Sequence, residues 1–174
     1  MTQETSIRKV QHHECNILTD LARNTFVQSF EAQNTREDMN AYVKVAFTEN
    51  RISEELRHPN SRFYFACMDQ SPIGYLKLNV DEAQTEHLLM DSLEIERIYV
   101  LPAYQNRKIG QMLLEWAIKT AIEEGFKSVW LGVWDQNARA ISFYKRNGFV
   151  PFSSHTFYLG SDKQNDLLMK KEIA

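Results

Sequence analysis

The chain has 174 residues, which is enough for one hydrophobic core, so a single domain over residues 1–174 is expected. Hydrophobic residues make up 43% and charged residues 25% of the sequence, which excludes the disordered and fibrous classes. The formal net charge is −3 without a long basic run, so neither nucleic acid nor a membrane is expected as a partner. No signal-peptide core and no stretch of roughly 18 apolar residues is present, and a cytoplasmic location is therefore expected.

Hydrophobic periodicity predicts the first elements of the chain. A strand at 6–11 precedes a helix at 14–30. A second helical region at 35–58 starts at Thr35 as its N-cap and is expected to break near 48–50. The apolar face of the first helix is predicted to be formed by Ile17, Leu21, Phe26 and Phe30.

A hairpin is predicted next, with strands at 62–69 and 74–80 and a turn built on Ser71, Pro72 and Gly74. The predicted fold class is α/β (α+β), with a mixed sheet of about seven strands flanked by about four helices. Ligands in such sheets gather at the carboxyl ends of the strands. After an acidic irregular span come a strand at 92–100, a helix from Lys108 to Gly125, a strand at 128–134, a helix at 137–148 and strands at 149–159 and 166–173.

The connection between the strand at 92–100 and the next helix concentrates polar and basic residues. Backbone N–H groups in the first turn of a helix have no partner within it, and with the helix dipole they suit an anion such as phosphate. Gly110 leaves the backbone open to a ligand, and Arg107 and Lys108 add positive charge. The segment is neither a Walker loop nor a dinucleotide-binding GxGxxG motif. By itself it predicts an anion site, with a solvated helix start as the alternative.

This segment resembles motif A of the GNAT superfamily of acetyl-CoA-dependent N-acetyltransferases, Q/R-x-x-G-x-G/A after a strand ending in I-Y-V-x-P. Lys108 stands where the family has its first glycine. Motif A is filled by Gln105, Asn106, Arg107, Lys108, Ile109 and Gly110. The family's motif B, N-x-x-A-x-x-F-Y-x-x-x-G-F, is filled by Asn137, Ala140, Phe143, Tyr144, Gly148 and Phe149. The phrases SLEIERIYV, WLGVW, FYKRNGF and NVDEAQ are most similar to PaiA-type bacterial spermidine/spermine acetyltransferases.

The resemblance implies an acyltransferase that uses acetyl-CoA as co-substrate and acetylates a polyamine or another small primary amine by direct transfer in a ternary complex. A homodimer through the last strands is a family expectation. A protein lysine or N-terminal acetyltransferase and an acetyl-CoA-binding regulatory module are the alternatives. The backbone of Ile98, Tyr99 and Val100 would bind the pantetheine arm, and the other cofactor-binding residues would be Gln105, Asn106, Arg107, Lys108, Ile109, Gly110, Gln111, Asn137 and Tyr144.

Acetyl transfer from a thioester to an amine requires a proton donor for the departing thiolate. Tyr144 matches the family tyrosine that lies near the sulfur. Because a phenol pKa of ~10 is close to that of an alkyl thiol, proton donation would be nearly thermoneutral. Simple packing of the ring beside Phe143 is the alternative.

The reaction also requires a proton acceptor, because an aliphatic amine with a pKa of ~10 is charged at neutral pH. Side chains alternate along a strand, so Glu94 and Glu96 are predicted to share one face with Ile98 and Val100. Glu96 is in register with the carboxylate that resembles the base of polyamine acetyltransferases, and would act directly or through water. An exposed glutamate paired with Arg97 or a lysine is the alternative.

Acidic residues cluster in the irregular span before the strand at 92–100. They are predicted to form a rim that attracts a polycation, with a solvated loop as the alternative. Trp130 and Trp134 fall on one strand face, where packing is the expected role. His12 and His13 have no third ligand at metal spacing, so no metal site is expected. The residues of the predicted rim are Asp81, Glu82, Glu86 and Asp91.

Overall fold

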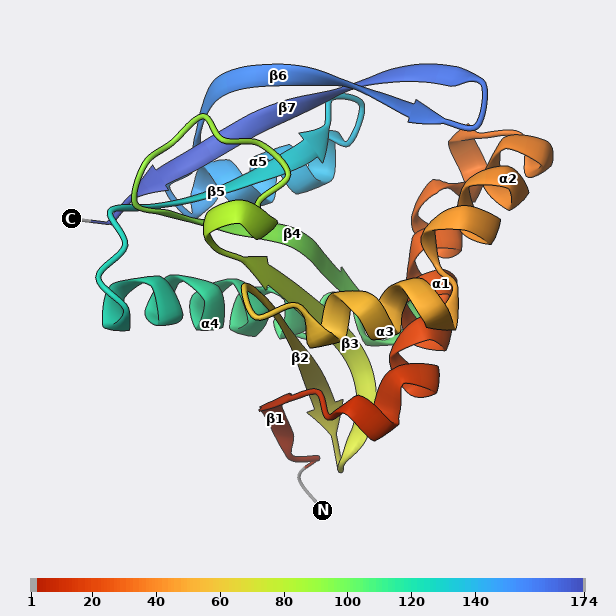
Figure 1. Cartoon of the computed structure of the whole chain (residues 1–174), viewed down its shortest axis with the longest axis horizontal. Helices are drawn as coiled ribbons and strands as arrows, with labels where there is room; N and C mark the ends of the chain where they lie inside the picture. Colours follow the sequence, from red (N-terminus) through yellow and green to blue (C-terminus); the bar gives the residue numbers. More distant parts are fainter. Residues whose placement is uncertain (1–2, 174) are drawn as a thin grey trace.

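The computed structural model describes residues 3–173, in which a seven-stranded mixed sheet lies between two layers of helices (Figure 1). The strand order is β1-β2-β3-β4-β5-β7-β6, and β4 and β5 pair in parallel. The predicted α/β class and the mixed sheet are confirmed. The strands are β1 (Thr5–Lys9), β2 (Ser61–Met68), β3 (Ser71–Asn79), β4 (Ser92–Val100), β5 (Ser128–Trp134), β6 (Val150–Leu159) and β7 (Asp162–Glu172).

The helices number one more than predicted, because the second helical region is two helices. Thr35 and Thr48 are the N-caps of these helices, and their hydroxyls accept from the backbone N–H groups of Asp38 at 3.1 Å and Arg51 at 3.2 Å. The predicted break is therefore confirmed and stabilised by the second cap. The α-helices of residues 3–173 are α1 (Cys15–Phe30), α2 (Arg36–Ala46), α3 (Glu49–Arg57), α4 (Ile109–Glu123) and α5 (Ala138–Arg146).

Each face of the sheet has its own hydrophobic core. On one face, the apolar stripe of α4 packs with residues of β3, β4 and β5, including Leu113, Leu76 and Ile95. On the other face, α1, α2 and α3 pack on β2 and β3, with Phe26 and Phe65 among the buried side chains. Within residues 3–173, none of the helices combines the length and the apolar character that crossing a membrane would need.

The turn of the β2–β3 hairpin lies at Asp69 and Gln70, earlier in the chain than predicted. Asp69 and Gln70 have φ angles of 48° and 71°, as in the tight two-residue turns that match the twist of paired strands. Ser71 and Pro72 belong to β3, so the turn predicted on Ser71, Pro72 and Gly74 is wrong. Gly74 instead allows close strand packing, because a Cβ atom there would lie 2.6 Å from a carbonyl oxygen of β4.

A β-bulge in the middle of β4 reverses its side-chain alternation. The pairing register with β3 shifts there, so Ile95 and Ile98 pack into the same core although they are three residues apart. Glu94 and Glu96 therefore lie on the opposite face, toward α1 and α3. The prediction that these glutamates share a face with Ile98 and Val100 is wrong, because the extra residue of the bulge is not visible in a simple period of two.

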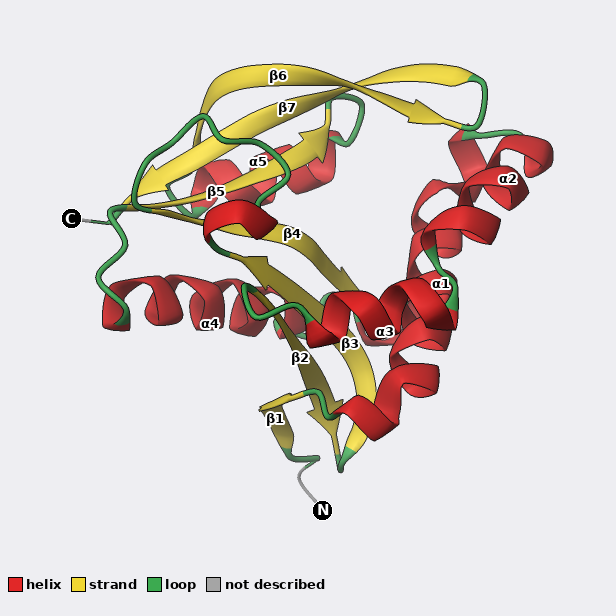
Figure 2. Cartoon of the chain, in the orientation of Figure 1, coloured by secondary structure: helices red, strands yellow, loops and turns green. Residues whose placement is uncertain are grey.

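The parallel strands β4 and β5 pair over only part of their length. Ser92–Ile95 pairs with Ser128–Leu131, and beyond these residues the two strands diverge (Figure 2). Residues 96–100 of β4 therefore keep β3 as neighbour on one edge and face an opening on the other. The candidate site lies in this opening.

Candidate active site

A cavity of about 430 Å³ fills the opening between the diverging ends of β4 and β5. Ile98, Val100 and Tyr144 line it from the face covered by α4 and α5. Glu94 and Trp134 line it from the face covered by α1 and α2. The volume is typical of small-molecule sites. Because the cavity passes between the strands, two ligands bound on opposite faces of the sheet could meet within it.

The backbone of β4 presents amide groups to this cavity. Leu101 donates its N–H to a β3 carbonyl at 2.8 Å, and antiparallel alternation therefore directs the backbone groups of Tyr99 toward β3. The backbone groups of Ile98 and Val100 face the opening, where the Val100 carbonyl accepts from the Gln105 side chain at 3.1 Å. Of the three predicted backbone contacts, Ile98 and Val100 are placed to bind an extended amide chain, whereas the Tyr99 backbone pairs within the sheet.

The connection after β4 adopts backbone angles that favour glycine. Asn106 and Lys108 have φ angles of 61° and 63°, in the left-handed region, and α4 begins directly after Lys108. This conformation explains physically why a glycine suits the position of Lys108. A Cβ atom on Gly110 would meet nothing within 4 Å, so the first turn of α4 is open to a ligand. Arg139 of α5 donates to the Asn106 side chain at 2.6 Å and ties the connection to the second motif.

The remaining predicted residues of this segment differ in their surroundings. The Arg107 guanidinium lies 5.5 Å from the centre of the Tyr104 ring, a cation–π contact. The Gln111 amide donates to the Asn147 side chain at 2.8 Å, which joins α4 to the end of α5. Ile109 is buried in the core, so its backbone N–H is the part that could serve an anion.

Replacing Lys108 by Gly is expected to stabilise the fold. A left-handed conformation costs an L-residue about 1–2 kcal/mol, which glycine avoids. The greater freedom of glycine in the unfolded chain lowers the stability by about 0.4–1 kcal/mol and so cancels part of this gain. We therefore expect the free energy of unfolding of Lys108→Gly, measured by urea titration, to be about 0.5–1 kcal/mol higher than that of Lys108→Ala. The alanine variant removes the same charge and keeps the strain, so equal stabilities of the two variants would contradict the strained conformation.

Tyr144 of α5 reaches the cavity from the face covered by α4. Its ring packs against Phe143 and Phe149, with centroids 5.3 and 5.9 Å away, and 7% of the residue is exposed. None of the described residues hydrogen-bonds its hydroxyl group, and burial raises the pKa of this phenol above its ordinary value. The ring thus has the packing role considered above. The hydroxyl keeps its proton and is available to a ligand, but its raised pKa makes it a weaker acid than the free phenol, so the expectation of nearly thermoneutral donation is not met.

Asn137 is the N-cap of α5. Its side-chain oxygen accepts from the backbone N–H of Ala140 at 3.1 Å, and the residue lines the cavity. The oxygen is therefore used by the helix, and the amide nitrogen is the group that Asn137 can offer to a ligand.

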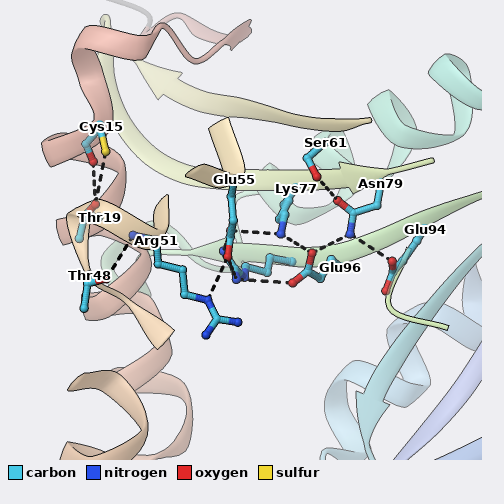
Figure 3. Close-up of polar contacts among 11 residues, drawn as sticks. Cys15, Thr19, Thr48, Arg51, Glu55, Ser61, Lys77, Asn79, Glu94 and Glu96 are labelled. Atoms are coloured by element: carbon cyan, nitrogen blue, oxygen red, sulfur yellow. Dashed lines mark hydrogen bonds and ion pairs between the residues drawn. The ribbon is translucent and has the colours of Figure 1, made fainter. Parts of the chain in front are cut away.

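Glu96 lies at the cavity but is held in a buried polar network (Figure 3). Its carboxylate contacts Lys77 Nζ at 2.5 Å, Asn79 Nδ2 at 2.6 Å and Arg97 Nη2 at 3.4 Å. Burial would raise the pKa of Glu96, but the charges of Arg97 and Lys77 outweigh it and hold the pKa below its usual range. Glu96 is therefore a stable anion and a weak base.

Glu55 of α3 completes this network. Its carboxylate accepts two hydrogen bonds from the Arg97 guanidinium, at 2.8 and 3.2 Å, and lies 3.1 Å from Lys77 Nζ. The buried cations Lys77 and Arg97 are thereby balanced by Glu55 and Glu96, and the exposed Arg51 also contacts Glu55, at 3.4 Å. Sequence reasoning missed Glu55 and Lys77, although a lysine in the middle of the apolar strand at 74–80 signals a buried partner.

Glu94 is the more basic of the two carboxylates that were predicted to share a strand face. It is 2% exposed and accepts from the backbone and hydroxyl of Thr85, at 2.8 and 2.5 Å, and from Asn79 at 3.1 Å. Burial raises the pKa of Glu94. The hydrogen bonds from Thr85 and Asn79 lower it, but these donors are neutral and offset the effect of burial only in part, so the pKa stays above its usual range. Figure 3 shows Glu94 and Glu96 on either side of Asn79.

The four residues of the predicted acidic rim lie in different surroundings and do not form one cluster around the cavity. Glu86 contacts His155 Nδ1 at 2.7 Å, and His155 lines the cavity. Asp91 pairs with Lys127 at 2.7 Å on the surface. Asp81 and Glu82 are exposed in a short turn after β3. Of the four predicted residues, Glu86 has a direct contact to a side chain that lines the cavity.

Comparisons with known proteins identify the relatives of this chain. The family model described as "Acetyltransferase (GNAT) family" matches residues 19–149. The "Uncharacterized N-acetyltransferase in pepI 3′region" of Lactobacillus delbrueckii subsp. lactis is 39% identical over 171 residues, 97% of this chain and 99% of that protein. A spermidine N(1)-acetyltransferase of Thermoplasma acidophilum is 26% identical over 147 residues, 82% of this chain and 86% of that protein. The crystal structure of PaiA N-acetyltransferase from Thermoplasma acidophilum in complex with coenzyme A shares the fold, with a TM-score of 0.80 and 24% identity over 97% of this chain and 99% of that one.

Proposed function

Because this chain belongs to the GNAT acetyltransferase family and is an N-acetyltransferase, we propose that it transfers an acetyl group from acetyl-CoA to a polyamine or another small cationic amine. The observation that carries the proposal is the cavity between β4 and β5. On one face of the sheet it presents backbone amides and a phenol, and on the other it presents buried carboxylates and aromatic rings. The first group suits an extended thioester, and the second suits an amine that carries positive charge.

The residues of the α4 face fit acetyl-CoA in their chemistry. The outward amides of Ile98 and Val100 and the side-chain nitrogen of Asn137 would hold the amide-containing arm. The backbone N–H groups at the start of α4, beside the open position of Gly110, would hold the pyrophosphate. Acetyl-CoA supplies a thioester carbonyl whose carbon is attacked by the amine.

Glu94 takes the proton from the acceptor ammonium in this proposal. Its raised pKa makes it a better proton acceptor than Glu96, and it lines the same cavity. Glu96 is paired with Lys77 and Arg97, so its charge is already balanced, and it helps to hold the buried network beside Glu94. The assignment of the base therefore moves from Glu96 to Glu94, while Glu96 keeps a supporting role.

Tyr144 donates its proton to the sulfur as the carbon–sulfur bond breaks. The new carbon–nitrogen bond forms directly between the two substrates, so no covalent enzyme intermediate is needed. The ammonium loses one proton to Glu94 before the attack and a second to solvent once the carbon–nitrogen bond has formed, and the proton gained by the thiolate comes from Tyr144. Solvent restores both groups after the products leave.

Thiol release from acetyl-CoA, measured with a panel of acceptors, tests the proposed function. We expect turnover with spermidine, spermine and small diamines, and little with peptides that offer a lysine or a free N-terminus. Turnover with peptides alone would favour protein acetylation. Tight binding of acetyl-CoA without turnover on any acceptor would instead favour a regulatory module.

A further inference from the structure

One half of the cavity extends over β5, β7 and β6 and has no part in the chemistry proposed above. The strand registers place Asp166 opposite both Trp134 and His155, so the three side chains lie on one face of the sheet. Phe157 and Gln164 are paired on the same face. All five residues line the cavity, and we call this region the distal half.

Aromatic rings from α1, α2 and the sheet enclose the distal half. The rings of Phe30 and Trp134 lie 6.0 Å apart, and those of Tyr42 and Phe157 lie 5.5 Å apart. Phe26 stacks on Tyr42 at 4.7 Å. Aromatic faces attract ammonium groups, and the attraction is strongest where water is excluded. The walls are therefore suited to a cation carried on an aliphatic chain.

Asp166 provides a carboxylate on this aromatic surface. Its nearest basic side chain in the described residues is His155, whose Nε2 lies 3.8 Å away, beyond hydrogen-bonding distance. His155 directs its other ring nitrogen to Glu86, at 2.7 Å. Asp135 is the further charged group near Asp166, and it is also acidic. A half-buried carboxylate without a hydrogen-bond donor is costly, and a bound cation would relieve that cost.

The spacing along β5 separates this carboxylate from the proposed reaction centre. Glu94 pairs with Trp130, and Asp166 pairs with Trp134, four residues further along the same strand. Four residues of a strand span about 13 Å. Tyr144, the proposed proton donor, lines the same cavity. One acceptor with two cationic nitrogens could therefore occupy both ends, and a monoamine could not.

We propose that Asp166 binds a second ammonium group of the acceptor, beside the ring of Trp134, and that it makes the enzyme select diamines and polyamines over monoamines. This inference rests on the proposed function, and it assigns Asp166 a role in specificity rather than in the chemical step. The reacting nitrogen lies near Glu94 and Tyr144, and the distal nitrogen lies near Asp166.

The variant Asp166→Asn tests the inference, because it removes the charge and keeps the shape. We expect the KM for spermidine to rise at least tenfold, with kcat changed less than about threefold, and the kinetics with butylamine to stay unchanged. Asp166→Glu should restore part of the preference for spermidine. Asp135→Asn removes a neighbouring exposed charge and is the matched control, for which both amines should behave as in the unaltered protein.

The outcomes separate this inference from the proposed function. Equal turnover of both amines by the unaltered protein, or an unchanged KM for spermidine in Asp166→Asn, overturns the role of Asp166 and leaves the proposed function intact. Calorimetric binding of spermidine without turnover, weakened tenfold in Asp166→Asn, supports Asp166 and overturns the proposed function. Neither binding nor turnover of any amine overturns both.

Discussion

Replacing Tyr144 by Phe is expected to lower kcat by about 10²- to 10⁴-fold, the usual contribution of a positioned general acid. The dissociation constant for acetyl-CoA should stay within about twofold, because the ring remains and only the hydroxyl is lost. Stability should also be nearly unchanged, since none of the described residues hydrogen-bonds that hydroxyl. Steady-state kinetics and calorimetric titration of the variant measure the two quantities.

Tyr158→Phe is the matched control for this substitution. Tyr158 lies on β6 and is 59% exposed, so loss of its hydroxyl should leave kcat unaltered. A kcat for Tyr144→Phe within twofold of the unaltered protein would exclude the proton-donor role and leave Tyr144 with its packing role alone.

Replacing Glu94 by Gln is expected to lower kcat/KM by about 100-fold and to change its pH dependence. The carboxylate accepts a proton only when ionised, and the raised pKa of Glu94 means that it is protonated at higher pH than an ordinary glutamate. Activity of the unaltered protein should therefore decline as the pH falls through that raised pKa. The glutamine variant cannot titrate, so this acidic limb should disappear from its pH-rate profile.

Glu96→Gln provides the comparison, because it alters the neighbouring carboxylate on the same strand. We expect this variant to keep the acidic limb, since Glu94 is intact. It should unfold at lower urea concentration, because Lys77 and Arg97 would then share Glu55 alone in a largely buried site. Loss of the acidic limb in Glu96→Gln but not in Glu94→Gln would return the role of base to Glu96.

Local sequence patterns predicted the elements that border the site. Thr35 and Thr48 start their helices as capping side chains, and apolar periodicity placed α4 and its buried face. The motif residues at the end of β4 and the start of α5 lie at the same cavity. These features depend on residues a few positions apart, which is why the sequence contains enough information to predict them.

The details of the charged groups could not be predicted in this way. The bulge in β4 places Glu94 and Glu96 on the face opposite to the predicted one, and its position depends on pairing with β3. The contact of Glu96 with Lys77 joins strands that are adjacent in space, and Glu55 reaches both from a helix. The alternation of side chains along a strand, with its period of two residues, predicts neither the bulge nor these partners.

Neighbouring residues alone were enough to predict the order of strands and helices, the family motifs and the helix start that follows β4, because each of these depends on residues close together in the chain. The tertiary structure decided which carboxylate is more basic, because burial and charged partners set the pKa values of Glu94 and Glu96 in opposite directions. It also brought Asp166, from the last strand, into the cavity with Glu94. That juxtaposition arises from strand order and register, which packing across the whole sheet determines.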